Sequence, residues 1–235
     1  GLISRLTTFI SADIESISKS QNFISTTPLP LIVYEVSRLL IKYPNLNTFF
    51  FNNNLIPHKS INIGVAFDNG QNGLKVASIE ETETKTLIEI EENISELAIK
   101  YNNNELSIKE LNSTSFTVTD LFSTGISNFH PLINNENSAI LGICGLNKNG
   151  FNIEISFDHR VSNGLEVSKF LNDLKFRLES RYVSNNNYFD EKSKNISCIK
   201  CLRDINEKTN LDIKFIRVQS QKENGYICSL CFSGW

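Results

Sequence analysis

Residues 153–164, which read IEISFDHRVSNG, constrain the fold of this chain more than any other stretch. The first five of them alternate apolar and polar side chains, and this two-residue period predicts a β-strand with one buried face. The strand runs straight into Asp158, His159 and Arg160, and the Ser-Asn-Gly that follows allows a sharp turn into a helix expected over residues 165–179. A titratable imidazole at the end of a buried strand, between an acid and a base, has the placement that a general base requires.

The rest of the chain alternates between helical and extended patterns. Apolar residues at helical spacing predict helices over residues 29–43, 86–101 and 107–111. Apolar or alternating runs predict strands over residues 49–51, 61–67, 74–79, 115–121 and 139–146. Two of these strands, on either side of Asn-Gly turns, are expected to form a hairpin. Helices alternating with strands, several of them in hairpin order, indicate an α/β two-layer sandwich rather than a doubly wound parallel sheet.

Size and composition fit one large domain, or one domain with a small appendage. The chain has 235 residues, of which 40% are hydrophobic, and it can bury a sizeable core. Composition shifts after Tyr182, so we expect one domain over residues 1–183 and a second over residues 184–235. No apolar run approaches the ~20 residues that span a bilayer, and no signal peptide precedes the first strand, which favours a cytoplasmic protein without membrane contact. The net charge of −3 argues mildly against a nucleic-acid partner.

The segment SFDHRVSNG resembles the DHRxxDG signature that closes the catalytic domain of the dihydrolipoamide acyltransferases, the cores of 2-oxo acid dehydrogenase complexes. Those domains share fold and mechanism with chloramphenicol acetyltransferase. Four further segments recur in family order, at residues 28–47, 61–79, 106–121 and 129–143. The resemblance therefore covers roughly residues 5–180, and it implies the chloramphenicol acetyltransferase type of sandwich, with residues 2–14 forming a strand that leads into a helix.

The resemblance also implies the roles of four residues. His159 would remove the proton from an attacking thiol or hydroxyl, for which an imidazole with an unperturbed pKa of ~6.5 is suited. Thr119 would hydrogen-bond the oxyanion of the tetrahedral intermediate, although threonine is also a common strand residue. Asn163 stands where the signature has an aspartate that anchors the arginine, so Arg160 must find its counter-ion in Asp158 or elsewhere. This replacement puts activity in question without excluding it.

Other positions depart from the family pattern or carry no chemistry. Phe122 stands where the family often has glycine, Asp120 where it has asparagine and Ala77 where it has proline. These positions lie near the substrate channel in the family, so they bear on which acyl group and acceptor fit. His58 and His130 each sit beside a proline in loop-like sequence, and we interpret both as structural or exposed.

The segment after residue 183 carries two CxxC pairs separated by 26 residues. Their members are Cys198, Cys201, Cys228 and Cys231. Four thiolates in this pattern are the ligand set of a structural zinc site, and a strand over residues 211–219 that turns back at 224–225 would complete a zinc ribbon. Disulfides, which a cytosolic setting disfavours, and a redox pair are the alternatives. Cys144, within an apolar run, is expected to be a small buried hydrophobe.

The function that we expect from the resemblance is acyl transfer. An acyl thioester of coenzyme A, or of the phosphopantetheine of an acyl carrier protein, would pass its acyl group to a thiol or hydroxyl acceptor. Family members assemble as trimers in which the imidazole of one chain faces the hydroxyl residue of its neighbour, so a homotrimer is expected, within a larger complex or synthase. The alternatives are a non-catalytic binding module recruited through its zinc ribbon, which the absence of a lipoyl domain favours, and an O-acetyltransferase acting on a small metabolite.

Overall fold

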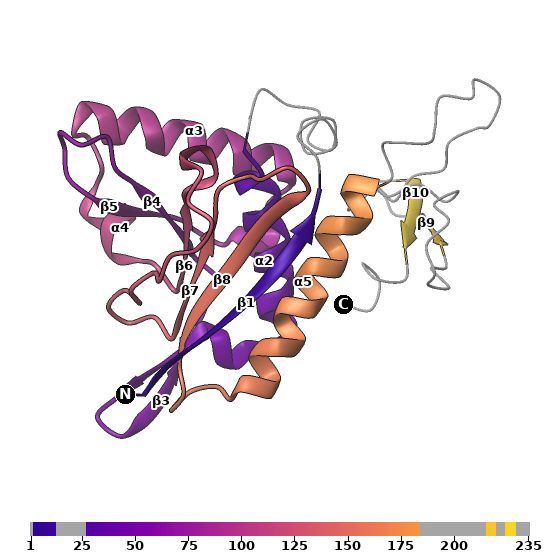
Figure 1. The fold of residues 1–235 in the computed structure, drawn as a ribbon, viewed down its shortest axis with the longest axis horizontal. Coiled ribbons are helices and arrows are strands. Elements are labelled where there is room, and N and C mark those ends of the chain that lie inside the picture. The colour runs from indigo at the N-terminus through magenta and orange to yellow at the C-terminus, as the bar shows by residue number, and fades with distance from the viewer. Residues whose placement is uncertain (1, 13–26, 184–214, 220–223, 229–235) are drawn as a thin grey trace.

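A computed structural model describes residues 2–12, 27–183, 215–219 and 224–228 (Figure 1). A six-stranded sheet forms its centre, in the order β1-β8-β7-β6-β4-β5. The strands are β1 (Ile3–Ser11), β4 (Ile63–Phe67), β5 (Lys75–Ile79), β6 (Phe116–Asp120), β7 (Ala139–Ile143) and β8 (Gly150–Asp158). β6 runs parallel to β4 and to β7, and the other neighbouring pairs are antiparallel. The sheet is therefore mixed, and the predicted α/β architecture is confirmed.

The helices are α2 (Leu29–Lys42), α3 (Leu87–Asn103), α4 (Ile108–Asn112) and α5 (Gly164–Val183). α2, α3 and α5 cover one face of this sheet (Figure 1), whereas the short α4 lies against the opposite face of β5, where the Ser78 hydroxyl donates to the Glu110 carbonyl at 3.1 Å. The apolar residues of β6, β7 and β8 that alternate toward the helices join one core cluster with α2 and α5. We call the opposite side, which bears the alternate residues of these strands, the outer face. None of the helices in the described ranges is both long and apolar enough to cross a membrane.

Local sequence signals explain where the helices begin and end. α2 follows Pro28 and ends at Lys42, one residue before the predicted end, with Tyr43 as its C-cap just before Pro44. α3 begins with a capping box, in which the Thr86 hydroxyl accepts a bond from the Glu89 backbone N–H at 3.3 Å and the Glu89 carboxylate accepts one from the Thr86 N–H at 2.7 Å. These contacts satisfy two N–H groups that the first turn leaves without helical partners.

Short elements connect the main ones. A hairpin of β2 (Thr48–Phe51) and β3 (Asn54–Pro57) turns through Asn52 and Asn53, whose φ angles of 47° and 61° are the left-handed values that asparagine tolerates. The 3-10 turns are η1 (Pro44–Asn47), η2 (Thr82–Thr84) and η3 (Phe122–Thr124). Near the C-terminus, β9 (Phe215–Gln219) pairs antiparallel with β10 (Asn224–Cys228). Two antiparallel strands were predicted there, but Asn224 and Gly225, which were expected to form the turn, already belong to β10.

Three of the cysteines expected to bind zinc lie outside the described residues: Cys198, Cys201 and Cys231. For Cys228 the structure describes only the backbone of β10. The helix expected after β1 also lies outside the described residues. Within the described ranges no group of three or more metal-binding side chains comes together. The zinc site and the division of the chain at residues 183 and 184 therefore remain predictions.

Candidate active site

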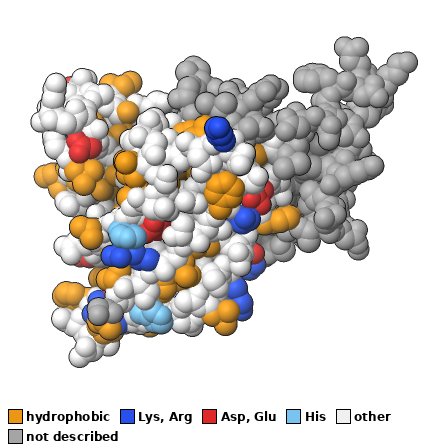
Figure 2. Space-filling model, in the orientation of Figure 1, with side chains coloured by type: hydrophobic (Ala, Val, Ile, Leu, Met, Phe, Trp, Pro, Cys, Tyr) orange, Lys and Arg blue, Asp and Glu red, His pale blue; other side chains and the backbone are white. Residues whose placement is uncertain are grey.

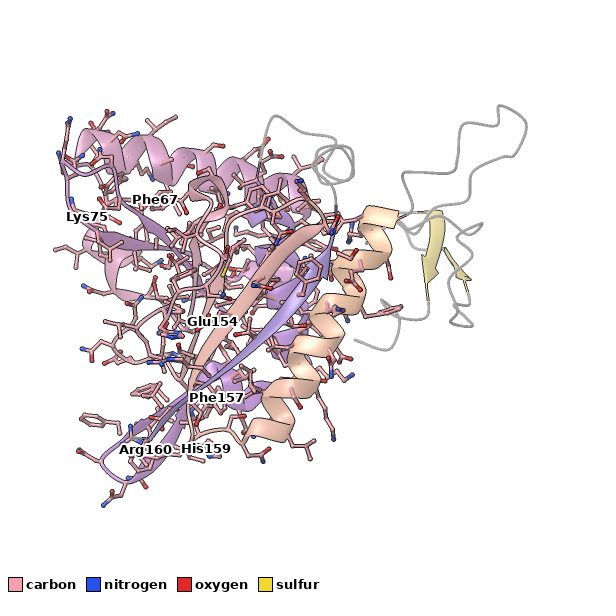
Figure 3. All side chains as sticks on the ribbon, viewed as in Figure 1. Phe67, Lys75, Glu154, Phe157, His159 and Arg160 are labelled. Atoms are coloured by element: carbon pink, nitrogen blue, oxygen red, sulfur yellow. The ribbon has the colours of Figure 1, made fainter. Side chains whose placement is uncertain are left out.

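His159 follows the last residue of β8 and is fixed there by its backbone. Its N–H donates to the carbonyl of Leu2 at 2.8 Å, which ties the end of β8 to the start of β1. The ring lies against Phe157, with 5.6 Å between ring centroids, and the side chain is exposed. Figure 3 shows this ring beyond the end of the sheet, beside Arg160. A fixed backbone and an exposed imidazole leave the ring able to meet a substrate at the surface of the chain.

Asp158 and Arg160, which flank His159 in the sequence, form an ion pair with each other. We call this pair the Asp158–Arg160 clamp. The guanidinium Nε lies 3.0 Å from both carboxylate oxygens and Nη2 lies 2.5 Å from Oδ2, while the Arg160 N–H donates to Oδ1 at 2.9 Å. Burial alone would raise the pKa of Asp158, but the hydrogen bonds and charge of Arg160 outweigh it and hold that pKa below its usual value. Arg160 also stacks 4.3 Å above the ring of Phe50. The clamp stiffens the turn that carries the imidazole, and it supplies the arginine with the counter-ion predicted for it.

Asn163 caps helix α5. Its Oδ1 accepts a hydrogen bond from the backbone N–H of Glu166 at 2.9 Å, and its carbonyl accepts one from Val167 at 3.1 Å. This is an N-cap, which an aspartate at the same position would also provide. The replacement of aspartate by asparagine in the signature therefore keeps the start of α5 intact, while Asp158 holds Arg160.

Thr119 lies on the outer face of β6. In the direction of the strands it is five residues away from the position of His159. In the sheet register Thr119 pairs with Gly142 on β7, and Gly142 pairs with Glu154 on β8. His159 comes five residues after Glu154, which at ~3.3 Å per residue is about 16 Å along the strand, and β6 is two strand spacings, about 10 Å, to the side. A single chain therefore does not bring the imidazole and the threonine hydroxyl together. A site that uses both groups needs two chains.

Two of the three departures from the family pattern, Phe122 and Ala77, lie in the interior, and Asp120 is half-buried. Phe122 packs edge-on against Phe151 at 5.3 Å, and Ala77 is fully buried in β5, so both belong to the helix-side core. Asp120 accepts a bond from the Phe122 N–H at 2.7 Å, and burial raises its pKa. The side chains of Phe122 and Ala77 face the core of this chain, and the expectation that these positions bear on the fit of substrate stays a prediction.

The remaining histidines and Cys144 each have defined neighbours in the fold. His58 Nε2 lies 2.7 Å from the carbonyl of Glu136, and its ring stacks on Phe49. His130 is exposed, and its Nδ1 hydrogen-bonds the buried carboxylate of Glu154. Cys144 is fully buried, and burial raises the pKa of its thiol to about 11, so it is the inert small hydrophobe that was predicted.

Sequence reasoning did not single out Glu154. Its place in an alternating strand suggested a solvent-facing residue, yet it is only 1% exposed, because the segment 125–138 covers this part of the outer face. The only feature of the sequence that pointed to Glu154 was the presence of an acidic residue in the strand that leads to His159. The pairing with His130 could not be predicted, since the two residues meet only after the loop folds over the sheet.

Comparison with known proteins places the chain in a family. Residues 4–183 match the model of 2-oxoacid dehydrogenases acyltransferase (catalytic domain). The chain belongs to this family. Among curated members of the acyltransferase family, it is 29% identical over 198 residues to the dihydrolipoyllysine-residue acetyltransferase component of the acetoin cleaving system of Bacillus subtilis, covering 75% of this chain and 50% of that protein. It is 30% identical over 198 residues to the corresponding component of the pyruvate dehydrogenase complex of Haemophilus influenzae, covering 74% and 35%. The chain thus spans half or less of the length of these relatives.

Solved acyltransferase structures share the fold. A probable dihydrolipoamide acetyltransferase from Listeria monocytogenes superposes with a TM-score of 0.69 at 25% identity, over 80% of this chain and 89% of that one. The Azotobacter vinelandii dihydrolipoamide acetyltransferase, investigated for the catalytic role of a serine, a histidine and an asparagine, superposes with a TM-score of 0.64 at 26% identity, over 75% and 82%. Chloramphenicol acetyltransferase, at 11% identity and a TM-score of 0.50 over 75% and 88%, shares the fold alone.

Proposed function

We propose that this acyltransferase-family chain transfers an acyl group from a thioester to an acceptor thiol, with His159 as the general base. The observation that carries the proposal is the exposed imidazole fixed at the end of β8, between the two halves of the Asp158–Arg160 clamp. The donor is an acyl thioester of coenzyme A or of carrier-bound phosphopantetheine. The curated relatives are named for a dihydrolipoyllysine residue, so the preferred acceptor is the thiol of a reduced lipoyl group.

The proposed reaction needs one base and one oxyanion donor. His159 takes the proton of the acceptor thiol, and the sulfur adds to the thioester carbonyl to give a tetrahedral adduct. Thr119 of a neighbouring chain donates a hydrogen bond to the oxygen of that adduct, which is worth about 10²–10³ in rate for such donors. Collapse breaks the bond to the original sulfur, and the imidazolium returns its proton to that leaving thiolate.

Asn163 does not argue against this chemistry. In the Azotobacter enzyme the asparagine whose catalytic role was investigated follows the histidine by four positions, which is also the spacing from His159 to Asn163. The asparagine of this chain also caps α5, so the turn that carries the imidazole keeps its geometry. Both points favour the catalytic reading over a non-catalytic binding module.

The assembly that follows is a homotrimer inside a larger complex. A single chain keeps its own His159 and Thr119 apart by the register of the sheet. Exposed apolar residues at the β1 edge, among them Leu2 and Ile3, are available for contact with another copy. One of the curated relatives is a component of a pyruvate dehydrogenase complex, which fits a role in such an assembly.

The test of the function is acyl transfer by the purified chain. Acetyl-CoA and dihydrolipoamide are mixed with the wild-type protein, with His159→Ala and with Lys169→Ala, an exposed change on α5. Release of coenzyme A and gain of an acetyl group by the acceptor, followed by chromatography and mass spectrometry, are expected for the wild type and Lys169→Ala only. Failure of the wild type to acylate any thiol or hydroxyl acceptor from coenzyme A or carrier thioesters would favour the binding module, and transfer to hydroxyl compounds alone would favour the O-acetyltransferase.

We also propose that the two CxxC pairs bind one structural zinc ion. The support is their spacing, together with the antiparallel pair β9 and β10 that lies between Cys201 and Cys231 in the chain. Elemental analysis of the full chain should give one zinc per chain, and substitution of Cys201 or Cys231 by serine should abolish it. A metal-free chain with two disulfides would contradict this proposal.

A further inference from the structure

A buried carboxylate lies on the outer face of the sheet, away from His159. Glu154 is in the middle of β8, as Figure 3 shows, and only 1% of it is exposed. Its neighbours in the register are Gly142 on β7 and Thr7 on β1. Burying a carboxylate is costly unless a partner compensates it. Its partner here is the imidazole of His130, which lies within hydrogen-bond reach through Nδ1.

The loop that carries His130 is fixed to the sheet. The Ile126 carbonyl accepts a bond from the Gly145 N–H at 2.6 Å, and the Asn152 amide donates to the Ser127 carbonyl at 3.0 Å. These bonds hold the backbone on the outer face, and Glu154 holds the ring. Since a carboxylate can only accept, the His130 Nδ1 carries the proton. Nε2, on the other side of the ring, is left for another partner, and the side chain is 61% exposed (Figure 2 shows histidine side chains at the surface of this face).

Glu154, the partner of His130, lies in the same row of the sheet as Thr119. Thr119 pairs with Gly142, and Gly142 pairs with Glu154, so two strand spacings, about 10 Å, separate the threonine backbone from that of the glutamate. The ring of Phe129 covers Gly142 between them, where a Cβ would lie 2.5 Å from its Cζ. An acyl group whose carbonyl is held at Thr119 can therefore extend over an apolar ring and end at His130.

We propose that His130, oriented by Glu154, is a specificity-determining residue that binds the far end of the acyl group. The preferred acyl groups carry a hydrogen-bonding group a few bonds beyond the thioester carbonyl. Neutral Nε2 accepts a bond from a hydroxyl group, and protonated Nε2 donates one to a carboxylate. Plain alkyl groups reach the same place but gain no hydrogen bond from this nitrogen, so they bind less well than the polar groups. This inference rests on the proposed function, because it assigns a substrate class to the same site.

The experiment compares three coenzyme A thioesters with one acceptor. Butyryl-CoA is the apolar reference, 3-hydroxybutyryl-CoA carries a neutral polar group and succinyl-CoA an anionic one. The value of kcat/KM is measured for the wild-type chain, for His130→Gln and Glu154→Gln, and for Lys109→Gln as control. Lys109 forms an exposed ion pair with Glu80 at 2.7 Å, on α4 by the far edge of the sheet. Circular dichroism confirms that each variant is folded.

The wild type is expected to favour at least one polar acyl group over butyryl by about 10-fold, the value of one hydrogen bond to a charged partner. His130→Gln should lose most of that preference with little change for butyryl, and Glu154→Gln should reduce it, while Lys109→Gln should keep it. The polar probe with the higher kcat/KM shows whether the site prefers a hydroxyl or a carboxylate group. Equal rates for all three probes, or equal losses for all three in His130→Gln, would overturn the inference and leave the function standing. A wild type that transfers none of them would overturn the function itself.

Discussion

Glu35 links α2 to α5 from inside the core, and its replacement by glutamine tests how these layers are held. The carboxylate is 2% exposed and receives hydrogen bonds from Arg177 Nη1 at 3.0 Å and Arg181 Nε at 2.9 Å. Burial alone would raise the pKa of Glu35, but the two guanidinium groups outweigh it and lower that pKa from 4.5 to about 2. A carboxyl whose pKa falls this far upon folding contributes about 3 kcal/mol to the free energy of unfolding at neutral pH.

Folding lowers the pKa of Glu35, and this decides how its contribution to the free energy of unfolding changes with pH. The contribution of Glu35 is fully present above pH 4.5 and is lost as the pH falls from there toward 2. At pH 7, Glu35→Gln should lower the free energy of unfolding by about 3 kcal/mol, because it leaves two partly buried guanidinium groups without the carboxylate charge.

The measurement is urea unfolding, followed by circular dichroism, at several pH values from 7 to 3. The difference in stability between wild type and Glu35→Gln should shrink as the pH approaches 3, since Glu35 of the unfolded wild-type chain then becomes protonated while the folded carboxylate stays ionised until about pH 2. A matched control is Glu80→Gln, which removes an exposed ion pair with Lys109 and should cost at most about 1 kcal/mol. Equal stabilities of wild type and Glu35→Gln at pH 7, or a difference that does not change with pH, would refute the reasoning.

Two further predictions concern the surroundings of the site. Asn163→Ala should lower the free energy of unfolding by about 1 kcal/mol, because the α5 cap is lost, whereas Asn163→Asp should leave it within about 0.5 kcal/mol of the wild type. Thermal or urea unfolding measures both effects. Equal effects of the two variants would contradict the capping role. Gly142→Ala should destabilise the chain by about 1–3 kcal/mol, because the new methyl group would meet the ring of Phe129. The loss of stability should appear as a lowered midpoint of urea unfolding. An unchanged midpoint would show that the ring is free to move away.

Much of the fold was predictable because local signals and apolar periodicity agree. The period-two pattern of residues 153–157 lies within β8, and the helices predicted from apolar spacing over residues 29–43 and 86–101 are found as α2 and α3, whose starts also carry a proline and a capping box. The capping role of Asn163 could also have been predicted, because an asparagine three residues before a glutamate is a pattern of helix starts. The family signature led instead to a catalytic interpretation of this residue.

What the sequence did not indicate depends on how distant segments meet. Alternation shows which side of a strand is apolar, but not that a loop covers the other side, and for this reason Glu154 was missed. The separation of Thr119 from His159 follows from the order and register of β6, β7 and β8, which no local pattern encodes. The interior positions of Phe122 and Ala77 follow from the direction of their side chains in the folded chain.

The central claim is that His159 of one chain acts with Thr119 of another. Co-expression of His159→Ala and Thr119→Ala chains, each inactive alone, tests it most directly through the acyl-transfer rate of the mixed assemblies. If each site takes its imidazole from one chain and its hydroxyl from the next, random mixing in equal amounts leaves about a quarter of the sites intact, and about a quarter of the wild-type rate should return. A mixed preparation that forms hetero-assemblies but is no more active than either parent would contradict the shared site.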